Sequence, residues 1–277
     1  MLSRRPLASS ADLVHIHRLQ PAADEGLYVA THTGLYRMDS GGRIAAVGDA
    51  THDLMGFTVA GPGDLLASGH PDLRDESLQA QGKPPLLGLV ASSDGVRWKP
   101  LSLLGDVDFH SLVTAHNRVY GLDSRTEALM VSKDRRTWEI RAKGLPFTDI
   151  AVDPTNPDTL MGAGSVSVAA SIDGGRSWRP VGTQQLQYLS WNKAGLFGIS
   201  PDGAIVTSTD GGETVEGQGR LIIRATTPVL CNPSRFPAFS EDLTEPGQPV
   251  ASSARDAAAG RQGASERVSA GGAIQPE

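Results

Sequence analysis

One short phrase recurs along this chain at a regular spacing, and it constrains the fold more than any other feature. The phrase reads Ser-x-Asp followed by Gly or Arg and, in three of four copies, by Trp; the copies occupy residues 92–98, 132–138, 171–178 and 208–215. A weaker copy occupies residues 36–42. A period of about 40 residues with strand-like sequence between the copies is typical of β-propellers, in which each small sheet buries its faces only against neighbouring sheets.

The residue types of the phrase point to a structural use. An Asp carboxylate accepts hydrogen bonds from the amides of a tight turn, Gly permits a positive φ, and Trp buries a large ring beneath a hairpin. We therefore assign a structural role, and no catalytic one, to the aspartates and tryptophans of the four copies, which are Asp94, Trp98, Asp134, Trp138, Asp173, Trp178 and Asp210.

These phrases resemble the Asp box, or bacterial neuraminidase repeat, Ser-x-Asp-x-Gly-x-x-Trp, of sialidases, sortilin-type receptors and photosystem II assembly-factor propellers. The copy at 171–178 matches the pattern in full, those at 92–98 and 132–138 are one residue shorter between Asp and Trp, and Val215 replaces Trp in the last copy. In the resembling families the box lies at the outer edge of a blade, between its third and fourth strands. The resemblance implies the same position here.

The sequence thus predicts an all-β chain, a β-propeller of about five recognisable four-stranded blades, incompletely closed, with a disordered C-terminal tail. We expect a flexible N-terminus over residues 1–12, the propeller over 13–220, and a non-repeat tail over 221–277 that is largely disordered from about residue 240, where aromatic residues are absent. Strands are expected at 56–60, 65–68, 86–92 and 98–101, at 109–115, 119–122, 128–132 and 138–141, and at 147–152, 159–162, 167–171 and 178–181.

The repeat stops at Val215, where the pattern calls for Trp. One extra base before a Trp codon would turn Thr-Trp into Thr-Val and change the reading frame downstream, which is a hypothesis about the gene. In either case we expect the first strand, over residues 14–19, to lack its usual neighbour and to present an exposed edge.

Charge and composition exclude several functional classes. Charged residues form 20% of the chain and the net charge is -6, which argues against a nucleic-acid partner. No apolar run is long enough for a membrane span, and residues 1–13 lack the apolar core of a secretory signal. The sequence as written therefore predicts a cytoplasmic protein, or an exported one if its N-terminus is truncated. The lone Cys231 offers no disulfide or metal spacing, and no cofactor is predicted.

Candidate functional residues fall in loops that share one end of the predicted blades. These loops join the second strand to the third or one blade to the next, and the second blade carries a long insertion over residues 69–85. We predict Asp53 or Asp123 as the acting carboxylate and His70 as a source of hydrogen bonds or a proton. The predicted ligand-binding residues are His32, His52, Asp72 and His110, and Asp106 and Asp108 lie in the same loops.

Histidines near the N-terminus raise the question of a metal. His15 and His17 alternate along one strand, so both imidazoles share a face, and with His32, His52, His70 or His110 they would form a site if the loops converge. The spacing does not require this arrangement, and no metal ligand is assigned from the sequence.

Three stretches resemble bacterial Asp-box proteins that are described as glycosyl-hydrolase-like, namely residues 27–34, 55–61 and 67–72. That resemblance implies a sialidase-superfamily propeller that recognises a carbohydrate or another polar small molecule at one face. The Arg-Ile-Pro motif of sialidases is absent, and none of the four tyrosines has a convincing Glu partner. A non-enzymatic scaffold for protein partners, similar to assembly-factor or sortilin-type propellers, is therefore the alternative, because fold alone does not choose between the classes.

Overall fold

The computed structural model describes residues 13–165, 167–182, 184–208 and 216–220. The chain divides into two compact units, Met1–Asp242 and Leu243–Glu277, and all described residues belong to the first. The predicted flexible N-terminus, the predicted disordered tail and the Asp210 turn lie outside the described residues.

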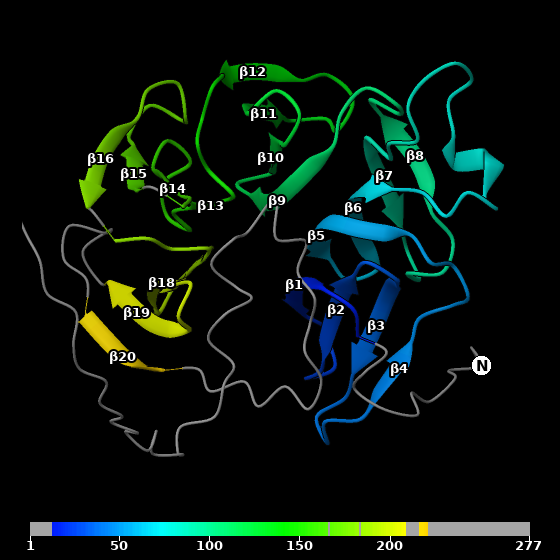
Figure 1. Cartoon of the computed structure of the whole chain (residues 1–277), viewed down its shortest axis with the longest axis horizontal. Helices are drawn as coiled ribbons and strands as arrows, with labels where there is room; N and C mark the ends of the chain where they lie inside the picture. The colour runs from blue at the N-terminus through cyan, green and yellow to red at the C-terminus, as the bar shows by residue number, and fades with distance from the viewer. Residues whose placement is uncertain (1–12, 166, 183, 209–215, 221–277) are drawn as a thin grey trace, which may run out of the picture. The chain divides into compact units, whose positions relative to one another are not determined.

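Twenty strands form five four-stranded antiparallel sheets in these residues, arranged as the blades of a propeller (Figure 1). The first two blades are β1 (Ile16–Pro21), β2 (Leu27–Thr31), β3 (Gly34–Met38) and β4 (Ile44–Ala46), and β5 (Asp53–Gly61), β6 (Asp64–His70), β7 (Leu89–Ser92) and β8 (Lys99–Ser102). The third is β9 (Phe109–Ala115), β10 (Arg118–Asp123), β11 (Ala128–Ser132) and β12 (Glu139–Ala142). The last two are β13 (Asp149–Val152), β14 (Leu160–Ala163), β15 (Val168–Ser171) and β16 (Arg179–Gly182), and β17 (Tyr188–Asn192), β18 (Gly195–Ile199), β19 (Ala204–Ser208) and β20 (Glu216–Arg220). The predicted all-β propeller of five blades is confirmed.

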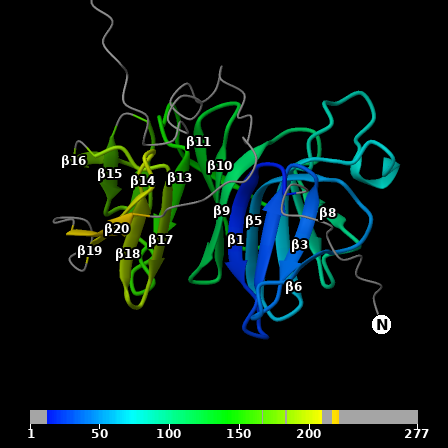
Figure 2. The same cartoon turned by 60° about the horizontal axis from the view of Figure 1, so that its bottom comes forward.

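Each blade follows the chain in order, and the first strands of successive blades pack side by side. Strand β5 packs against both β1 and β9. Strand β13 lies between β9 and β17 (Figure 2). Among the described strands no comparable packing links the fifth blade to the first. Ile16 and Leu19 on β1 are 44% and 50% exposed and Val14 just before it is 43% exposed, so this edge presents apolar side chains to solvent.

The apolar core lies between blades. One cluster joins Leu35 of the first blade to Phe57 and Trp98 of the second, and equivalent clusters lie between the second and third, third and fourth, and fourth and fifth blades. Burial of these faces is the main favourable contribution to folding, since one small sheet cannot cover its own apolar surface.

The recurring phrase forms the turn between the third and fourth strands of a blade. Asp94 Oδ1 accepts hydrogen bonds of 2.9 Å from the amides of Val96 and Arg97, and Asp134 and Asp173 accept equivalent pairs. These amide contacts lower the pKa of Asp94. The fourth strand then begins one residue after each Trp.

One copy of the turn departs from the glycine pattern. Arg135 stands where the first copy has Gly95, and both have a positive φ, 64° and 75°. The Arg135 guanidinium pairs with Asp64 of the neighbouring blade through bonds of 2.8 and 2.6 Å. This contact offsets backbone strain that a side chain at positive φ introduces.

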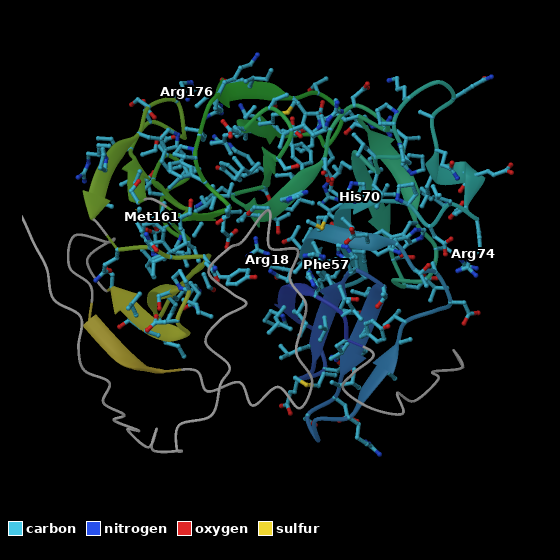
Figure 3. All side chains as sticks on the ribbon, in the orientation of Figure 1. Arg18, Phe57, His70, Arg74, Met161 and Arg176 are labelled. Atoms are coloured by element: carbon cyan, nitrogen blue, oxygen red, sulfur yellow. The ribbon has the colours of Figure 1, made fainter. Side chains whose placement is uncertain are left out.

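A buried ion pair joins first strands from different blades. Arg18 on β1 donates to both oxygens of Asp149 on β13, at 2.9 and 2.6 Å (Arg18 is labelled in Figure 3). Asp149 also accepts from the Ser111 hydroxyl on β9 and from the Leu189 amide on β17. Burial by itself would lower the pKa of Arg18, but Asp149 raises it above its ordinary value. One carboxylate thus connects four blades.

Two glycines in second strands admit aromatic rings at equivalent positions. A Cβ on Gly121 would lie 2.5 Å from the Phe109 ring, and one on Gly162 would lie 2.5 Å from Phe147. Those rings stack near Trp138 and Trp178, with centroids 4.9 and 4.8 Å apart.

We predict that Gly121→Ala destabilises the protein by about 1–3 kcal/mol through overpacking. Urea unfolding measures this, and Gly61→Ala, which has open space around its Cβ, is the control. Equal stabilities for the two variants would contradict the ring contact.

Loss of Arg18 tests the ion pair. Arg18→Met leaves the Asp149 carboxylate buried without its cation, and we expect a loss of about 3–5 kcal/mol in the free energy of unfolding. Arg43→Met is the matched control, because Arg43 is 88% exposed and pairs with Asp39 on the surface, where a pair contributes about 0–1 kcal/mol. A cost at Arg18 no larger than at Arg43 would show that the pair does not hold the blades.

Candidate functional site

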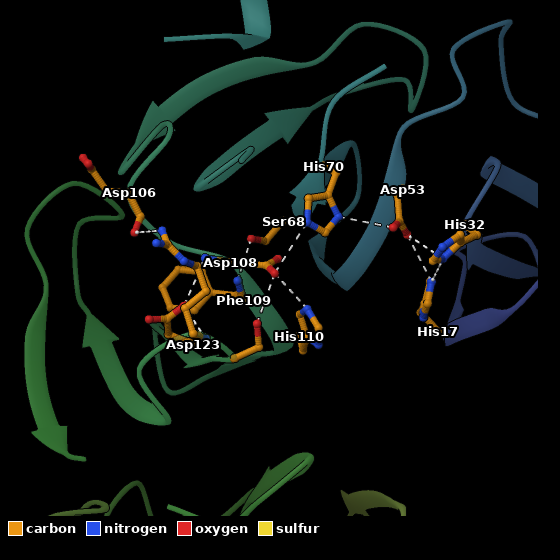
Figure 4. Close-up of polar contacts among 12 residues, drawn as sticks. His17, His32, Asp53, Ser68, His70, Asp106, Asp108, Phe109, His110 and Asp123 are labelled. Carbon is orange, nitrogen blue, oxygen red and sulfur yellow. Dashed lines mark hydrogen bonds and ion pairs between the residues drawn. The ribbon is translucent and has the colours of Figure 1, made fainter. Parts of the chain in front are cut away.

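Histidines and aspartates gather where the first strands begin and the second strands end. Antiparallel pairing places them there: Asp53 at the start of β5 is the register partner of His70 at the end of β6, and Asp123 at the end of β10 pairs with Phe109 at the start of β9. We call the contacting set the polar cluster, and it consists of His17, His32, Asp53, His70, Asp108 and His110 (Figure 4). The turns of the recurring phrase lie at the opposite ends of the strands.

A single imidazole stands between two carboxylates in this cluster. His70 Nδ1 lies 3.2 Å from Asp53 Oδ2, and His70 Nε2 lies 3.7 Å from Asp108 Oδ2. His110 Nε2 is 2.9 Å from the same Asp108 oxygen, and the Ser124 hydroxyl donates to it at 3.1 Å. The His70 side chain is 40% exposed, whereas those of Asp53 and Asp108 are 16% and 7% exposed. His70 is therefore the member of this row that solvent reaches best.

The other oxygen of Asp53 faces two more imidazoles. Asp53 Oδ1 lies 3.1 Å from His17 Nε2 and 3.2 Å from His32 Nδ1, and these two nitrogens are 3.0 Å apart. His17 comes from β1 and His32 directly follows β2, so this part of the cluster joins the first and second blades. The His15 ring lies beside it, with its centroid 5.2 Å from that of His32.

The environment keeps both carboxylates ionised. Burial by itself would raise the pKa of Asp53, but the nearby imidazoles of His17 and His70 lower it well below its usual range. Burial likewise opposes ionisation of Asp108, and His110 and Ser124 outweigh it, so its pKa is also lowered. The acid of a two-carboxylate glycosidase needs a raised pKa. Neither residue has that property.

His52 and Asp72 anchor the insertion instead of facing solvent. His52 is 3% exposed and its Nδ1 accepts the Asp72 amide at 2.9 Å; burial lowers the His52 pKa. The Asp72 carboxylate binds the Arg74 guanidinium and accepts from the Thr51 amide and hydroxyl at 3.1 and 3.0 Å. A hollow beside them is lined by Asp49, Ala50, Asp72, Arg74 and Asp75. These contacts fix the base of the insertion, which contains the short helix η2 (Glu76–Leu78).

Asp123 is buried and supports the polar cluster through its contact with Asp108. It is 2% exposed, and its Oδ1 accepts the Asp108 amide at 3.1 Å while Oδ2 accepts the Thr126 hydroxyl. Asp106 forms a surface pair with Lys83 at 2.7 Å. The structure thus brings Asp53, His70, His32 and His110 into one cluster and places Asp72, His52 and Asp123 in buried supporting contacts; the functional roles assigned to them from the sequence remain predictions.

One member of the polar cluster, Asp108, had a weak signal in the sequence, and an ion pair of the fold had none. Asp108 was only one of several loop aspartates, and its place at one end of the row depends on the pairing of β9 with β10. The Arg18–Asp149 pair had no signal, because the two residues are 131 positions apart.

The comparisons with known proteins report the fold. No protein-family model and no curated protein matches the chain in sequence. A gluconolactonase from Xanthomonas campestris is 14% identical with a TM-score of 0.56, covering 78% of this chain and 84% of that one. A chain of a nidogen/laminin complex is 12% identical (TM-score 0.56, 75% and 83% covered), and YCF48 bound to D1 peptide is 13% identical (TM-score 0.51, 78% and 83% covered).

At such identities the likeness establishes a shared architecture, and the chain is a five-bladed β-propeller. Its structural neighbours include an enzyme and propellers in complex with a protein or a peptide. The described residues contain no helix long and apolar enough to cross a membrane.

The Asp72 contacts give a pH-dependent prediction. Its pKa is lowered, chiefly by the Arg74 guanidinium and then by the Thr51 amide, from an ordinary value of 3.8. A lowered carboxyl pKa contributes stability that is present above the unfolded pKa and is lost as the pH falls through the folded pKa. We expect wild-type protein to melt at a higher temperature than Asp72→Asn at pH 7, with the difference shrinking below about pH 3.8. A difference that is constant from pH 7 to pH 2 would contradict the pairing.

Proposed function

We propose that this propeller binds a polar, hydroxyl-bearing small ligand of the carbohydrate class at the polar cluster. The observation that carries the proposal is the row Asp53–His70–Asp108, in which a 40% exposed imidazole stands between two ionised carboxylates. Carboxylates accept, and imidazoles donate or accept, the hydrogen bonds by which hydroxyl groups are recognised. Asp53 and His70 lie at strand ends and Asp108 immediately precedes β9, and such positions hold side chains more rigidly than free loops would.

Hydrogen bonding to charged acceptors gives such a site its affinity. A hydrogen bond to an ionised group contributes about 1.5–3 kcal/mol, more than one between neutral groups. One oxygen of Asp108, Oδ1, is buried and has no hydrogen-bond partner in the described structure. His70, beside it, provides the solvent-facing group that a bound hydroxyl would meet first.

The proposed ligand class is linked to a proposed family. The three described turns of the recurring phrase support an Asp-box propeller of the sialidase-like, glycosyl-hydrolase-like kind, and the ligand class follows from that resemblance. Within it, His70 supplies hydrogen bonds or a proton to the ligand, and Asp53 and Asp108 orient the imidazole. Buried Asp123 acts by holding the Asp108 backbone.

Variants of the row test this function. A glycan array and a panel of fluorogenic glycosides would be applied to wild-type protein, His70→Gln and Asp108→Asn. We expect wild-type protein to retain one glycan class and each variant to bind it about 10-fold or more weakly, the effect of losing one hydrogen bond to a charged group.

His116→Asn is the matched control for these variants. His116 lies on the exposed turn between β9 and β10, contacts the Asp153 carbonyl at 2.8 Å, and has a positive φ that Asn tolerates. The His116→Asn variant should bind the glycan as the wild type does. Absence of any bound glycan, or equal binding by His70→Gln and wild type, would refute the proposal.

A second function is favoured by one observation on β1. Ile16 and Leu19 on β1 and Val14 just before it are each more than two-fifths exposed, as is Tyr188 on β17 at 43%. Exposed apolar side chains on an edge strand mark a surface that can pair with another chain. A protein partner at β1 is the alternative, and a pull-down that loses its partner on Ile16→Lys but not on His70→Gln would favour it.

A further inference from the structure

We propose that His17, His32 and Asp53 form a binding site for a divalent transition-metal ion, with Zn²⁺ as the best-suited ion. The proposal goes beyond ligand binding by the polar cluster and does not depend on it. It rests on three donor atoms from two blades, His17 Nε2, His32 Nδ1 and Asp53 Oδ1.

The spacing of these atoms matches the edge of a metal coordination sphere. They are separated by 3.0 Å between the two nitrogens, 3.1 Å from His17 to Asp53 and 3.2 Å from His32 to Asp53. Zinc bonds to nitrogen and oxygen of about 2.0–2.1 Å at tetrahedral angles place neighbouring donor atoms about 3.3 Å apart. A small shift of the three side chains would therefore bring all three atoms to bonding distance of one ion.

The protein's own hydrogen bonds satisfy this triangle only in part, because His17 Nε2 and His32 Nδ1 share a hydrogen bond while the Asp53 oxygen takes none. Asp53 Oδ1 is buried and has no hydrogen-bond partner of good geometry, although two ring nitrogens lie within 3.2 Å of it. A buried carboxylate oxygen without a partner carries a free-energy cost. One cation at the centre of the triangle would accept lone pairs from all three atoms at once. The N–H protons of two imidazoles cannot satisfy all three atoms equally well.

Surrounding contacts hold the three side chains in position. The register of β1 against β2 shifts between Ile16 and Arg18, and this irregularity at His17 aims its ring toward the cluster. The His32 amide is held by backbone carbonyls at the start of β1. Asp53 Oδ2 contacts His70 Nδ1, so the carboxylate is oriented by a group outside the three ligands, as is common in metal sites.

The donor set selects the class of ion. Two imidazoles and one carboxylate suit zinc and other first-row transition ions, whereas Mg²⁺ and Ca²⁺ prefer oxygen donors. The His32 side chain is 49% exposed, which leaves one side of the triangle open to solvent. Three protein ligands and an open side are the arrangement of zinc sites that exchange water for a bound molecule.

Cobalt titration tests the site directly. Tag-free full-length protein is treated with a chelator, dialysed and titrated with Co²⁺, whose visible absorption reports its coordination, and Zn²⁺ is then added in competition. We expect one Co²⁺ to bind per chain with the absorption of a low-coordinate N/O site, and Zn²⁺ to displace it.

Two kinds of variant make the test specific. His17→Asn and His32→Asn each remove a metal ligand. Loss of a residue that only hydrogen-bonds to a ligand typically weakens metal binding 10–100-fold, and we expect loss of a ligand itself to weaken Co²⁺ binding by at least as much. Asp53→Asn keeps the side-chain shape but removes the charge, and we expect a comparable loss. His116→Asn introduces the same substitution outside the cluster and should bind Co²⁺ as wild type does.

Melting temperatures recorded in chelator check that each variant folds, and Zn²⁺ should raise the melting temperature of wild type and His116→Asn only. Absence of a Co²⁺ spectrum in wild type, or equal Co²⁺ affinity in wild type and the ligand variants, would overturn the proposal. Glycan binding measured in chelator is a separate readout, so failure of the metal site and failure of the proposed function are distinguishable.

Discussion

Every sheet of this protein depends on its neighbours, because a four-stranded sheet with two apolar faces cannot cover either face alone. The apolar clusters accordingly lie between successive blades and combine residues from both. This packing brings β1, β5, β9, β13 and β17 close together, and the Arg18–Asp149 ion pair joins β1 to β13. Because the strands alternate in direction, the same packing brings the starts of first strands and the ends of second strands to one end of the blades.

The aspartates of this chain have the same chemistry and different uses, which their partners decide. Asp94 accepts amides in a hairpin turn, Asp72 and Asp123 hold loops, and Asp149 binds a buried guanidinium. Among the aspartates that the structure describes, only Asp53 and Asp108 have a partly exposed imidazole against the carboxylate. That difference, and no property of the residue type, separates the candidate site from the supporting contacts.

The shared architecture leaves function to the site, since structural neighbours of this chain include a lactonase and propellers bound to a protein or a peptide. The two proposals assign the two carboxylate oxygens of Asp53 to different sites. Its Oδ2 faces His70 and the row that we assign to a polar ligand, and its Oδ1 faces His17 and His32, which we assign to a metal ion. A metal at the second position would lie next to a ligand at the first, so the two sites would be coupled through one carboxylate.

The repeated phrase was sufficient to predict the blades. A phrase repeated at about 40 residues defines local turns through short-range contacts, such as Asp94 with the amides of residues 96 and 97, and the strands between follow from the apolar pattern. The sequence also placed Asp53, His70 and His110 at one end, because that follows from strand order. Tertiary structure decided the remainder: that His17 and His32 share one oxygen of Asp53, that Asp72 and Asp123 are buried, and that Arg18 reaches Asp149. Those outcomes depend on the distances between blades and on side-chain direction, which arise only when separate sheets pack and which no spacing along the chain encodes.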